Sequence, residues 1–298
     1  MDAFETFLKE HSGNRICTVT PGGNHGDTLI HMGLLKKLDE FGIEYECRNL
    51  EEIYGGDALT GAKYILNIAA WRLGLEAGFR LIRIPEGTDL ILFEGGGYMN
   101  DVWYGPVLLR QVVRRNPQPI AVAPQSYWFN GTDFVALLPV DRYVTLFCRE
   151  LRSLDLLRGM ERLENVSLHV SGDTALYLER RDLEPLIGNA PEPHTLICLR
   201  EDKESLMDPG RRREIIDGVS DPLVSDISKK GDLSSFVSAV ANSKRVHTDR
   251  LHVAILAHIL GRRATLYSNR YHKNRGVYEY SLRDDPGIDF VDLGGRIA

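Results

Sequence analysis

Short apolar segments alternate with helical stretches over about the first 180 residues, and this alternation limits the possible folds more than any other feature. Six segments rich in β-branched and apolar residues recur there: Ile16–Thr20, Ile43–Cys47, Leu90–Phe93, Ile120–Ala123, Tyr143–Cys148 and Val166–Val170. Segments that are apolar at every position, such as LILF at 90–93, suit central parallel strands because helices cover both faces of such a sheet. The pattern predicts parallel βαβ units, and therefore an α/β fold with a doubly wound sheet.

A proline-containing segment separates this region from a second α/β region. Pro185, Pro191 and Pro193 lie in a stretch with few large apolar residues, which is typical of an interdomain linker. Four further segments beyond it are predicted to be strands: Thr195–Leu199, Arg245–His247, Ala264–Tyr267 and Asp289–Val291. The 298 residues suffice for two ordinary domains. We therefore expect an N-terminal doubly wound domain over 1–190, a smaller α/β domain over 191–298, and a cleft between these two Rossmann-like domains.

The composition is that of a globular protein that does not act on nucleic acid. Lys and Arg number 36 against 42 Asp and Glu, so the net charge of −6 leaves no basic surplus to neutralise a phosphate backbone. The four cysteines form no CxxC pair, which predicts free thiols in a reducing cytoplasm. No secretory signal is visible, and the apolar runs are shorter than the roughly 20 residues that span a bilayer. We expect a cytoplasmic protein, and a peripheral position at the inner face of the membrane is the alternative.

Two glycine-rich loops follow predicted strands. The first, PGGNHGDT, contains Asn24 and Asp27, and backbone N–H groups in such a loop favour an anion or a sugar. Its alternative explanation is a tight turn that needs glycine. The second loop contains Gly95, Gly96 and Gly97, and three consecutive glycines after a central strand allow a ligand to approach the main chain.

Polar residues also follow two other predicted strands. Gln125 and Ser126 follow one strand, and Arg149 stands at the next strand-to-helix junction, where it is able to bind a carboxylate or phosphate in bidentate fashion. A surface arginine paired with nearby acids is the alternative for Arg149. Asp173 follows a further strand, and three roles are open for it: helix capping, domain packing or catalysis. The charged stretch at 201–232 is either solvated surface or a lid that closes on an anion.

The most informative segment is RVHTDRLHVAILAHIL, which begins at Arg245. A strand ends near Thr248 and a helix that is apolar almost all round begins near Arg250, so this helix is predicted to be buried. Arg250 and His252 lie in its first turn and need polar partners there, because an unpaired buried charge is costly. His252 is therefore a candidate acid or base, with a satisfied core histidine as its alternative.

Together these motifs resemble the polysaccharide pyruvyl transferase family. The resemblance spans roughly residues 20–275 and rests on the following residues, of which the Arg250 motif weighs most: Asn24 to Asp27 (N-x-G-D), Gly95 to Gly97, Pro124-Gln125-Ser126, Arg149 with Ser153, Asp173-x-Ala175, and Arg250-Leu251-His252 followed by Ile255, Ala257 and Gly261.

The resemblance implies a glycosyltransferase-B-like architecture and an enzyme of exopolysaccharide biosynthesis. Such an enzyme transfers pyruvate from phosphoenolpyruvate onto a sugar of a saccharide or lipid-linked saccharide as a ketal. The donor is then expected against the second domain and the acceptor against the first. His252 and Arg250 become the expected catalytic residues. The expected substrate-binding residues are Asn24, Asp27, Gly95, Gly96, Gly97, Gln125, Ser126, Arg149, Leu251 and Lys273.

The chemistry of phosphoenolpyruvate agrees with these residues. Its carboxylate and phosphate need cationic donors, which Arg149, Arg250 and either Lys273 or Arg200 supply, and His252 suits one of the proton transfers. No metal-ligand spacing is present, so we expect no metal and no cofactor apart from the donor substrate. A nucleotide-sugar-dependent glycosyltransferase of the same architecture is one alternative, and a noncatalytic saccharide-binding homologue is another.

Overall fold

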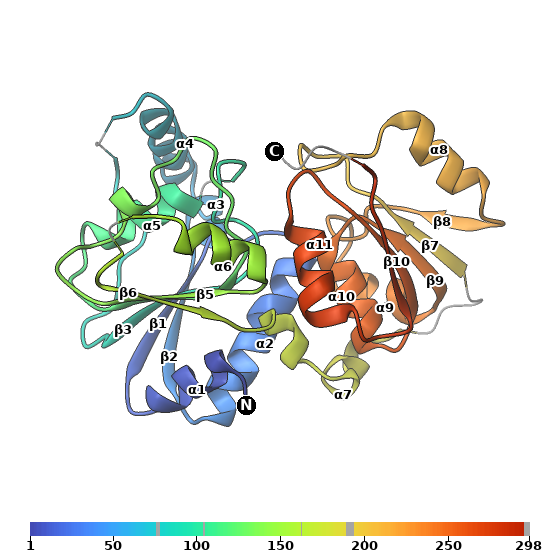
Figure 1. Ribbon diagram of the computed structural model, residues 1–298. Coiled ribbons are helices and arrows are strands. Elements are labelled where there is room, and N and C mark those ends of the chain that lie inside the picture. The colour runs from blue at the N-terminus through green and yellow to red at the C-terminus, as the bar shows by residue number, and fades with distance from the viewer. Residues whose placement is uncertain (76–77, 104, 162, 189–193, 295–298) are drawn as a thin grey trace. The chain divides into compact units, whose positions relative to one another are not determined.

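A computed structural model describes residues 1–75, 78–103, 105–161, 163–188 and 194–294 of the chain (Figure 1). These residues form two compact units. Unit 1 comprises Met1–Gly23 and Leu34–Ser171, and unit 2 comprises Asn24–Gly33 and Gly172–Ala298. Each unit contains one parallel sheet, so the expected α/β class with two Rossmann-like units is confirmed.

Unit 1 contains a six-stranded sheet with the order β2-β1-β3-β4-β5-β6, and every neighbouring pair is parallel. The strands are β1 Arg15–Thr20, β2 Glu44–Asn49, β3 Leu90–Phe93, β4 Ile120–Gln125, β5 Val144–Cys148 and β6 Val166–Val170. The helices associated with this sheet are α1 Ala3–Glu10, α2 His25–Glu40, α3 Leu50–Gly55, α4 Ala58–Arg72, α5 Gly105–Val113, the short η1 Val135–Leu137 and α6 Leu151–Arg158. Strands β3 and β4 are buried along their whole length, as their apolar sequences predict.

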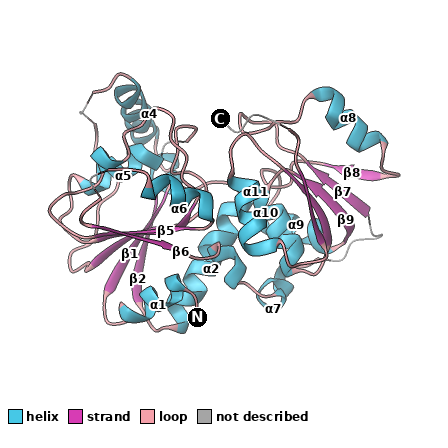
Figure 2. Cartoon of the chain, in the orientation of Figure 1, coloured by secondary structure: helices cyan, strands magenta, loops and turns pink. Residues whose placement is uncertain are grey.

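Unit 2 contains a five-stranded parallel sheet with the order β11-β10-β9-β7-β8 (Figure 2). The strands are β7 His194–Cys198, β8 Pro222–Val224, β9 Ser243–Thr248, β10 Arg263–Tyr267 and β11 Ile288–Val291. The helical segments are η2 Thr174–Tyr177, α7 Arg180–Leu183, η3 Glu184–Leu186, α8 Pro209–Asp217, α9 Leu233–Ala241, α10 Leu251–Ile259, α11 Lys273–Val277 and the π-helical η4 Tyr278–Leu282.

Helices cover both faces of the unit 2 sheet. On one face, Leu196 and Val246 pack with residues of α9 and α10 in a large apolar core. On the other face, Ile197 and Tyr267 pack with α8. Because successive side chains of a strand point to opposite faces, this division follows directly from the apolar runs of β7 and β10.

The boundary between the units differs from the expected one near Pro191, a residue that lies outside the described part of the chain. Unit 2 begins at Gly172, and it also contains Asn24–Gly33 from the start of α2. The reason is packing, because Ala175, Leu178 and Leu183 are buried in the apolar core of unit 2. The prolines around 185–193 therefore follow the change of unit and do not mark it.

Two further features bear on the sequence predictions. Cys17, Cys148 and Cys198 are buried free thiols and Cys47 is a partly buried one, and burial raises the pKa of Cys17 to about 11. Among the described residues, none of the helices combines the length and the apolar composition needed to cross a bilayer.

Gly33 allows α2 to approach η2 closely. A Cβ atom at Gly33 would lie 1.9 Å from the carbonyl oxygen of Thr174. We expect Gly33→Ala to lower the unfolding free energy by about 1–3 kcal/mol, because overpacking outweighs the better helix propensity of alanine. Gly61 of α4 is the matched control: its added Cβ would lie 3.4 Å from Tyr54, so Gly61→Ala should be neutral or slightly stabilising. Urea unfolding of both variants tests this, and equal stabilities would contradict it.

Candidate active site

The carboxyl end of β9 sets the first turn of α10 in a polar region of unit 2. The hydroxyl of Thr248 donates to the carbonyl oxygen of Cys198 at 2.7 Å and accepts from the backbone N–H of Arg250 at 2.9 Å. This turn holds Asp249 and Arg250 directly before α10, which begins at Leu251. Parallel strands end at the same edge of their sheet, so the loop after β7 lies beside this turn.

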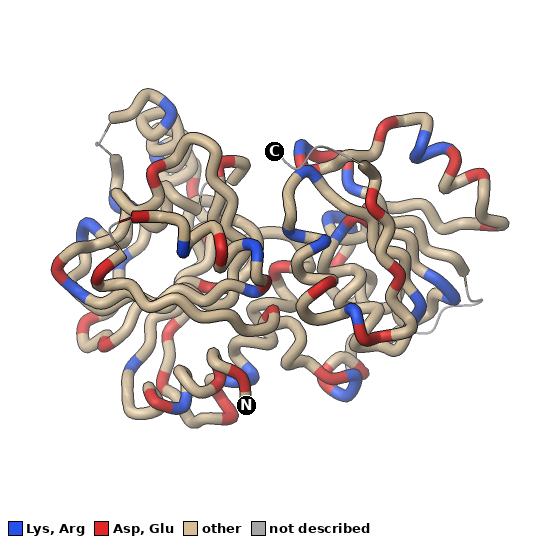
Figure 3. Tube along the Cα trace, viewed as in Figure 1, with Lys and Arg blue, Asp and Glu red and all other residues tan. Residues whose placement is uncertain are grey.

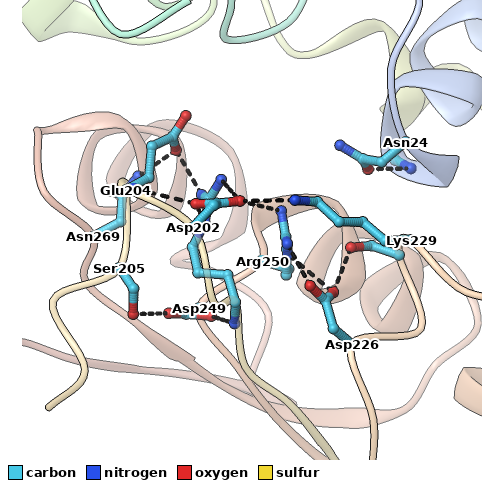
Figure 4. A network of polar contacts seen from close by, with 12 residues as sticks. Asn24, Asp202, Glu204, Ser205, Asp226, Lys229, Asp249, Arg250 and Asn269 are labelled. Carbon is cyan, nitrogen blue, oxygen red and sulfur yellow. Dashed lines mark hydrogen bonds and ion pairs between the residues drawn. The ribbon is translucent and has the colours of Figure 1, made fainter.

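Two carboxylates hold the Arg250 guanidinium (Figure 4). Its Nε donates to Asp226 Oδ1 at 3.1 Å and its Nη2 to Asp226 Oδ2, which is a bidentate arrangement. Its Nη1 lies 3.2 Å from Asp202 Oδ2. The residue is buried, so the two acids provide the compensation that a buried cation requires.

The same network continues to Lys273. Arg200 donates from Nε to Asp202 Oδ1 at 2.7 Å and from Nη1 to Glu204 Oε2 at 2.5 Å. Glu204 Oε2 also accepts from Lys273 Nζ at 2.5 Å and from Asn269 Nδ2 at 3.3 Å. Arg250 and Lys273 therefore belong to one connected network with Asp202 and Glu204. The two acids lie far before them in the sequence.

Burial and nearby charges act in opposite directions on the acids of this network. Burial alone would raise the pKa of Asp202, but its hydrogen bond to Arg200 and the charges of Arg200 and Arg250 lower that pKa well below its usual range. Burial raises the pKa of Asp249, whose Oδ1 accepts from the backbone N–H of Arg200 at 2.7 Å. Asp202 is therefore a permanent anion, and Asp249 mainly fixes the start of the loop after β7.

His252 faces a buried carboxylate. Its Nε2 lies 3.3 Å from Asp173 Oδ2, while Asp173 Oδ1 accepts from the backbone N–H of Ala175 at 2.9 Å. Asp173 caps η2 and is almost fully buried, so its position is set by the backbone. The histidine ring is partly buried, and this contact orients it within the first turn of α10.

The first turn of α2, which follows Asn24 and contains Gly26 and Asp27, packs against His252. Asp27 Oδ2 accepts from the side-chain amide of Asn24 at 2.8 Å, and Asn24 Oδ1 accepts from the backbone N–H of Gly26 at 2.9 Å. A Cβ atom at Gly26 would lie 2.7 Å from the Cβ and 2.8 Å from the Nδ1 of His252. Asn24 and Asp27 thus organise the first turn of α2, and the missing side chain of Gly26 lets this turn pack closely against His252.

In unit 1 the glycine triplet serves the sheet itself. A Cβ atom at Gly95 would lie 2.5 Å from the carbonyl oxygen of Pro124, and Gly96 has a positive φ of 129°. The backbone N–H of Gly96 donates to Pro124 at 3.1 Å, and its carbonyl accepts from Ser126 at 2.9 Å. Close backbone approach explains Gly95, and the positive φ explains Gly96. The oxygen of the third, Gly97, accepts from Asn100 Nδ2 at 2.9 Å within a turn.

Gln125, Ser126 and Arg149 also come together at this edge of unit 1. Arg149 is fully buried, so it is not the surface arginine of the alternative explanation. Its Nε donates to Ser126 Oγ at 2.8 Å, and its backbone N–H donates to the carbonyl of Gln125 at 3.1 Å. The buried amide oxygen and nitrogen of Gln125 have no hydrogen-bond partner among the described residues. Because an unsatisfied buried amide is costly, Gln125 stays a candidate for contact with a polar ligand.

Comparison with known proteins identifies the family. The model of the polysaccharide pyruvyl transferase family matches residues 24–271. The chain belongs to this family. As a member of this family, the protein is a transferase of polysaccharide biosynthesis, and its acceptor is a saccharide.

A solved structure shows the same fold. An uncharacterized protein of Klebsiella pneumoniae subsp. pneumoniae matches with a TM-score of 0.64 at 23% identity, over 97% of this chain and 96% of that one. The UDP-GlcNAc 2-epimerase of Methanocaldococcus jannaschii matches with a TM-score of 0.49 at 11% identity, over 93% of this chain and 89% of that one. No curated protein matches this family member at a significant level.

The family motif Arg250-Leu251-His252 combines two polar residues with one apolar residue of the core. Leu251 is buried within the apolar core of unit 2, where it anchors the first turn of α10. Its neighbours Arg250 and His252 point to different carboxylates, Asp226 and Asp173. The role of Leu251 in this family member is therefore explained by packing, which holds the polar residues on either side.

Sequence reasoning missed the acids that complete the network. Asp202, Glu204 and Asp226 come from the charged stretch at 201–232, for which solvated surface or a lid was expected. Part of that stretch does lie on the surface, since α8 has no buried residue and carries charges of both signs (Figure 3). Acids close to an arginine-rich segment were a signal available in the sequence, but their partners Arg250, at the start of α10, and Lys273, in α11, were not. Within the described ranges, no group of three or more His, Cys, Asp or Glu is arranged to hold a metal ion, and metal independence stays a prediction.

Proposed function

We propose that this family member transfers pyruvate from phosphoenolpyruvate to two hydroxyl groups of a sugar, as a ketal. The acceptor is a saccharide or lipid-linked saccharide, and the reaction belongs to surface polysaccharide assembly in the cytoplasm. The observation that carries the proposal is the contact of His252 with the buried Asp173 carboxylate. His252 stands two residues after Arg250, which is itself held by acids. Both residues lie within the region that the family model matches.

The proton balance of this reaction suits His252. Two sugar oxygens form bonds to carbon 2 of the donor, and the bond from that carbon to the phosphate oxygen breaks. Of the two hydroxyl protons, one goes to the methylene carbon, which becomes a methyl group, and the other leaves with phosphate. Because Nε2 of His252 faces Asp173, the carboxylate orients the ring and favours hydrogen on Nε2, and an imidazole held in this way suits one of these proton transfers.

The cations of unit 2 suit the anionic donor. Arg250, Arg200 and Lys273 are held by carboxylates before any donor binds, which reduces the entropy lost when the site is ordered. Lys229, whose side chain is 47% exposed and lies 3.4 Å from Asp202, is the most accessible cation of this network. We expect the carboxylate and phosphate of the donor to contact Lys229 and Arg250, with unit 1 on the acceptor side.

Donor binding distinguishes this proposal from the glycosyltransferase alternative. At a phosphoenolpyruvate concentration 100 times its Kd, stabilisation of about 2.7 kcal/mol is expected, which should raise the melting temperature by several degrees. UDP-sugars at the same concentration should leave it unchanged. A rise with UDP-sugars alone would favour a glycosyltransferase.

Turnover requires a second measurement. Phosphate release from phosphoenolpyruvate should depend on an oligosaccharide from a panel of acceptors, and mass spectrometry should find the acceptor heavier by one pyruvate ketal. Donor binding without phosphate release across a broad panel would favour the noncatalytic homologue.

A further inference from the structure

Two buried residues lie just beyond the point where β9 and β10 stop pairing. The register of this parallel pair ends with Thr248 opposite Leu266, so Asp249 and Tyr267 are the first residues past it. Asp249 is fully buried and Tyr267 nearly so. Because a buried carbonyl group without a donor is costly, the backbone carbonyls of these two residues need hydrogen-bond donors from elsewhere in unit 2.

Asn274 of α11 supplies a donor to both carbonyls. Its Nδ2 donates to the carbonyl oxygen of Asp249 at 2.8 Å and to that of Tyr267 at 2.9 Å. Asn274 is fully buried, and its own backbone N–H donates to Asn269 Oδ1 at 3.3 Å. The side-chain amide therefore uses its two N–H bonds to join the carboxyl ends of two neighbouring strands.

The orientation of this amide is set by its nitrogen. Oδ1 of Asn274 is buried and has no hydrogen-bond partner within the described ranges of the chain. Exchanging the oxygen and the nitrogen would point an acceptor at two carbonyl oxygens, so the amide takes one orientation only. A buried amide oxygen without a partner is unfavourable. The contribution of this side chain therefore lies in what its nitrogen holds in place.

The peptide group between Asp249 and Arg250 is held at both of its polar atoms. Its carbonyl oxygen accepts from Asn274 Nδ2, and its N–H donates to Thr248 Oγ1 at 2.9 Å. This peptide leads directly into α10, for which Arg250 is the N-cap residue. The two hydrogen bonds fix the backbone from which the Arg250 side chain extends, and the carboxylates described above fix its guanidinium.

The helix that carries Asn274 also carries Lys273, another cation of the network. Lys273 directly precedes Asn274, and its Nζ donates to Glu204 Oε2. Asn269, in the segment before α11, donates to the same oxygen at 3.3 Å (Figure 4). The hydrogen bond from Asn274 to the peptide of Arg250 therefore joins the backbone segments that carry the two cations.

We propose that Asn274 is a positioning residue, which holds Arg250 and Lys273 in one arrangement before the anionic donor binds. The inference rests on the proposed function, because it concerns the cations to which phosphoenolpyruvate is expected to bind. Asn274 acts through these cations and through the Arg250 peptide. Groups that are placed in advance lose less entropy on binding, so the loss of Asn274 should weaken donor binding.

Calorimetric titration of the full chain with phosphoenolpyruvate tests the proposal. Asn274→Leu keeps the approximate size of the side chain and removes both donated bonds, whereas Asn274→Ala removes the size as well. Each variant is titrated at a temperature at which its melting curve shows it to be folded. Both should bind the donor about tenfold more weakly than the wild type, which corresponds to about 1.4 kcal/mol, roughly the net value of one hydrogen bond.

Hydrogen exchange gives a second measurement that needs no donor. The backbone N–H of Arg250 should exchange faster in Asn274→Leu than in the wild type, because the peptide is then held at one of its polar atoms only. If the wild type does not bind phosphoenolpyruvate, the proposed function is wrong. Faster exchange at Arg250 would still support the hold of Asn274 on this peptide.

Asn165→Ala is the matched control in unit 1. Nδ2 of Asn165 also donates to two backbone carbonyls, those of Pro139 at 2.6 Å and Arg142 at 2.5 Å. This variant should lower the melting temperature but leave donor affinity and exchange at Arg250 as in the wild type. Wild-type donor affinity, or unchanged exchange at Arg250, in folded Asn274→Leu would overturn the proposal. So would an equal loss of donor affinity in Asn165→Ala, because the effect would then be one of stability alone.

Discussion

Replacing His252 with glutamine is expected to lower turnover by roughly 10²- to 10⁴-fold while donor affinity stays within a few-fold. Glutamine keeps some hydrogen bonding toward Asp173 but cannot carry a proton between donor and acceptor. Steady-state kinetics and donor titration on one preparation measure these effects.

His258→Gln provides the matched control on the same helix. Its Nδ1 contacts Asp285 Oδ2 at 2.5 Å at the other end of α10, so this variant loses a comparable contact between histidine and carboxylate. It should lose some thermal stability and keep parental turnover per folded molecule. If His252→Gln behaves in the same way, with lower stability and intact turnover, His252 is a structural residue.

Arg250→Ala is expected to lower the unfolding free energy by about 3–5 kcal/mol, because it leaves the carboxylates of Asp226 and Asp202, which are only 10% and 14% exposed, without their shared cation. The folded fraction of this variant should also lose most of its affinity for phosphoenolpyruvate. Urea unfolding measures the first effect, and calorimetric titration at a temperature where the variant is folded measures the second.

Two further variants separate charge from geometry at Arg250. Arg250→Lys keeps the charge but loses the bidentate contact with Asp226, so it should recover part of the stability and less of the donor affinity. Arg245→Ala, on the preceding strand β9, removes a solvent-exposed pair with Asp289 and should cost at most about 1 kcal/mol with donor affinity unchanged. Full donor affinity in folded Arg250→Ala would make Arg250 a purely structural residue.

The structure confirms the elements that local patterns predict strongly. The segments at 90–93 and 120–123 are central buried strands because an apolar run at every position requires cover on both faces. The buried helix after Thr248 is found where its apolar residues and the polar first turn predict it. The domain boundary was less predictable, because prolines mark a loop whereas the unit boundary depends on which core receives Ala175 and Leu178.

Hydrophobic periodicity and strand-end position are local properties, and from them the sequence by itself predicted the parallel α/β class and the candidates Arg250 and His252. The family came from the resemblance of its motifs. Partners across long separations are not local. Only the tertiary structure decided that Asp226 and Asp202 hold Arg250 and that Asp173 holds His252. It also decided that Gly95 serves close backbone approach and that Asn274 holds the carbonyl of Asp249. These outcomes depend on which loops lie together at the edge of a sheet and on which face of a helix packs against the core.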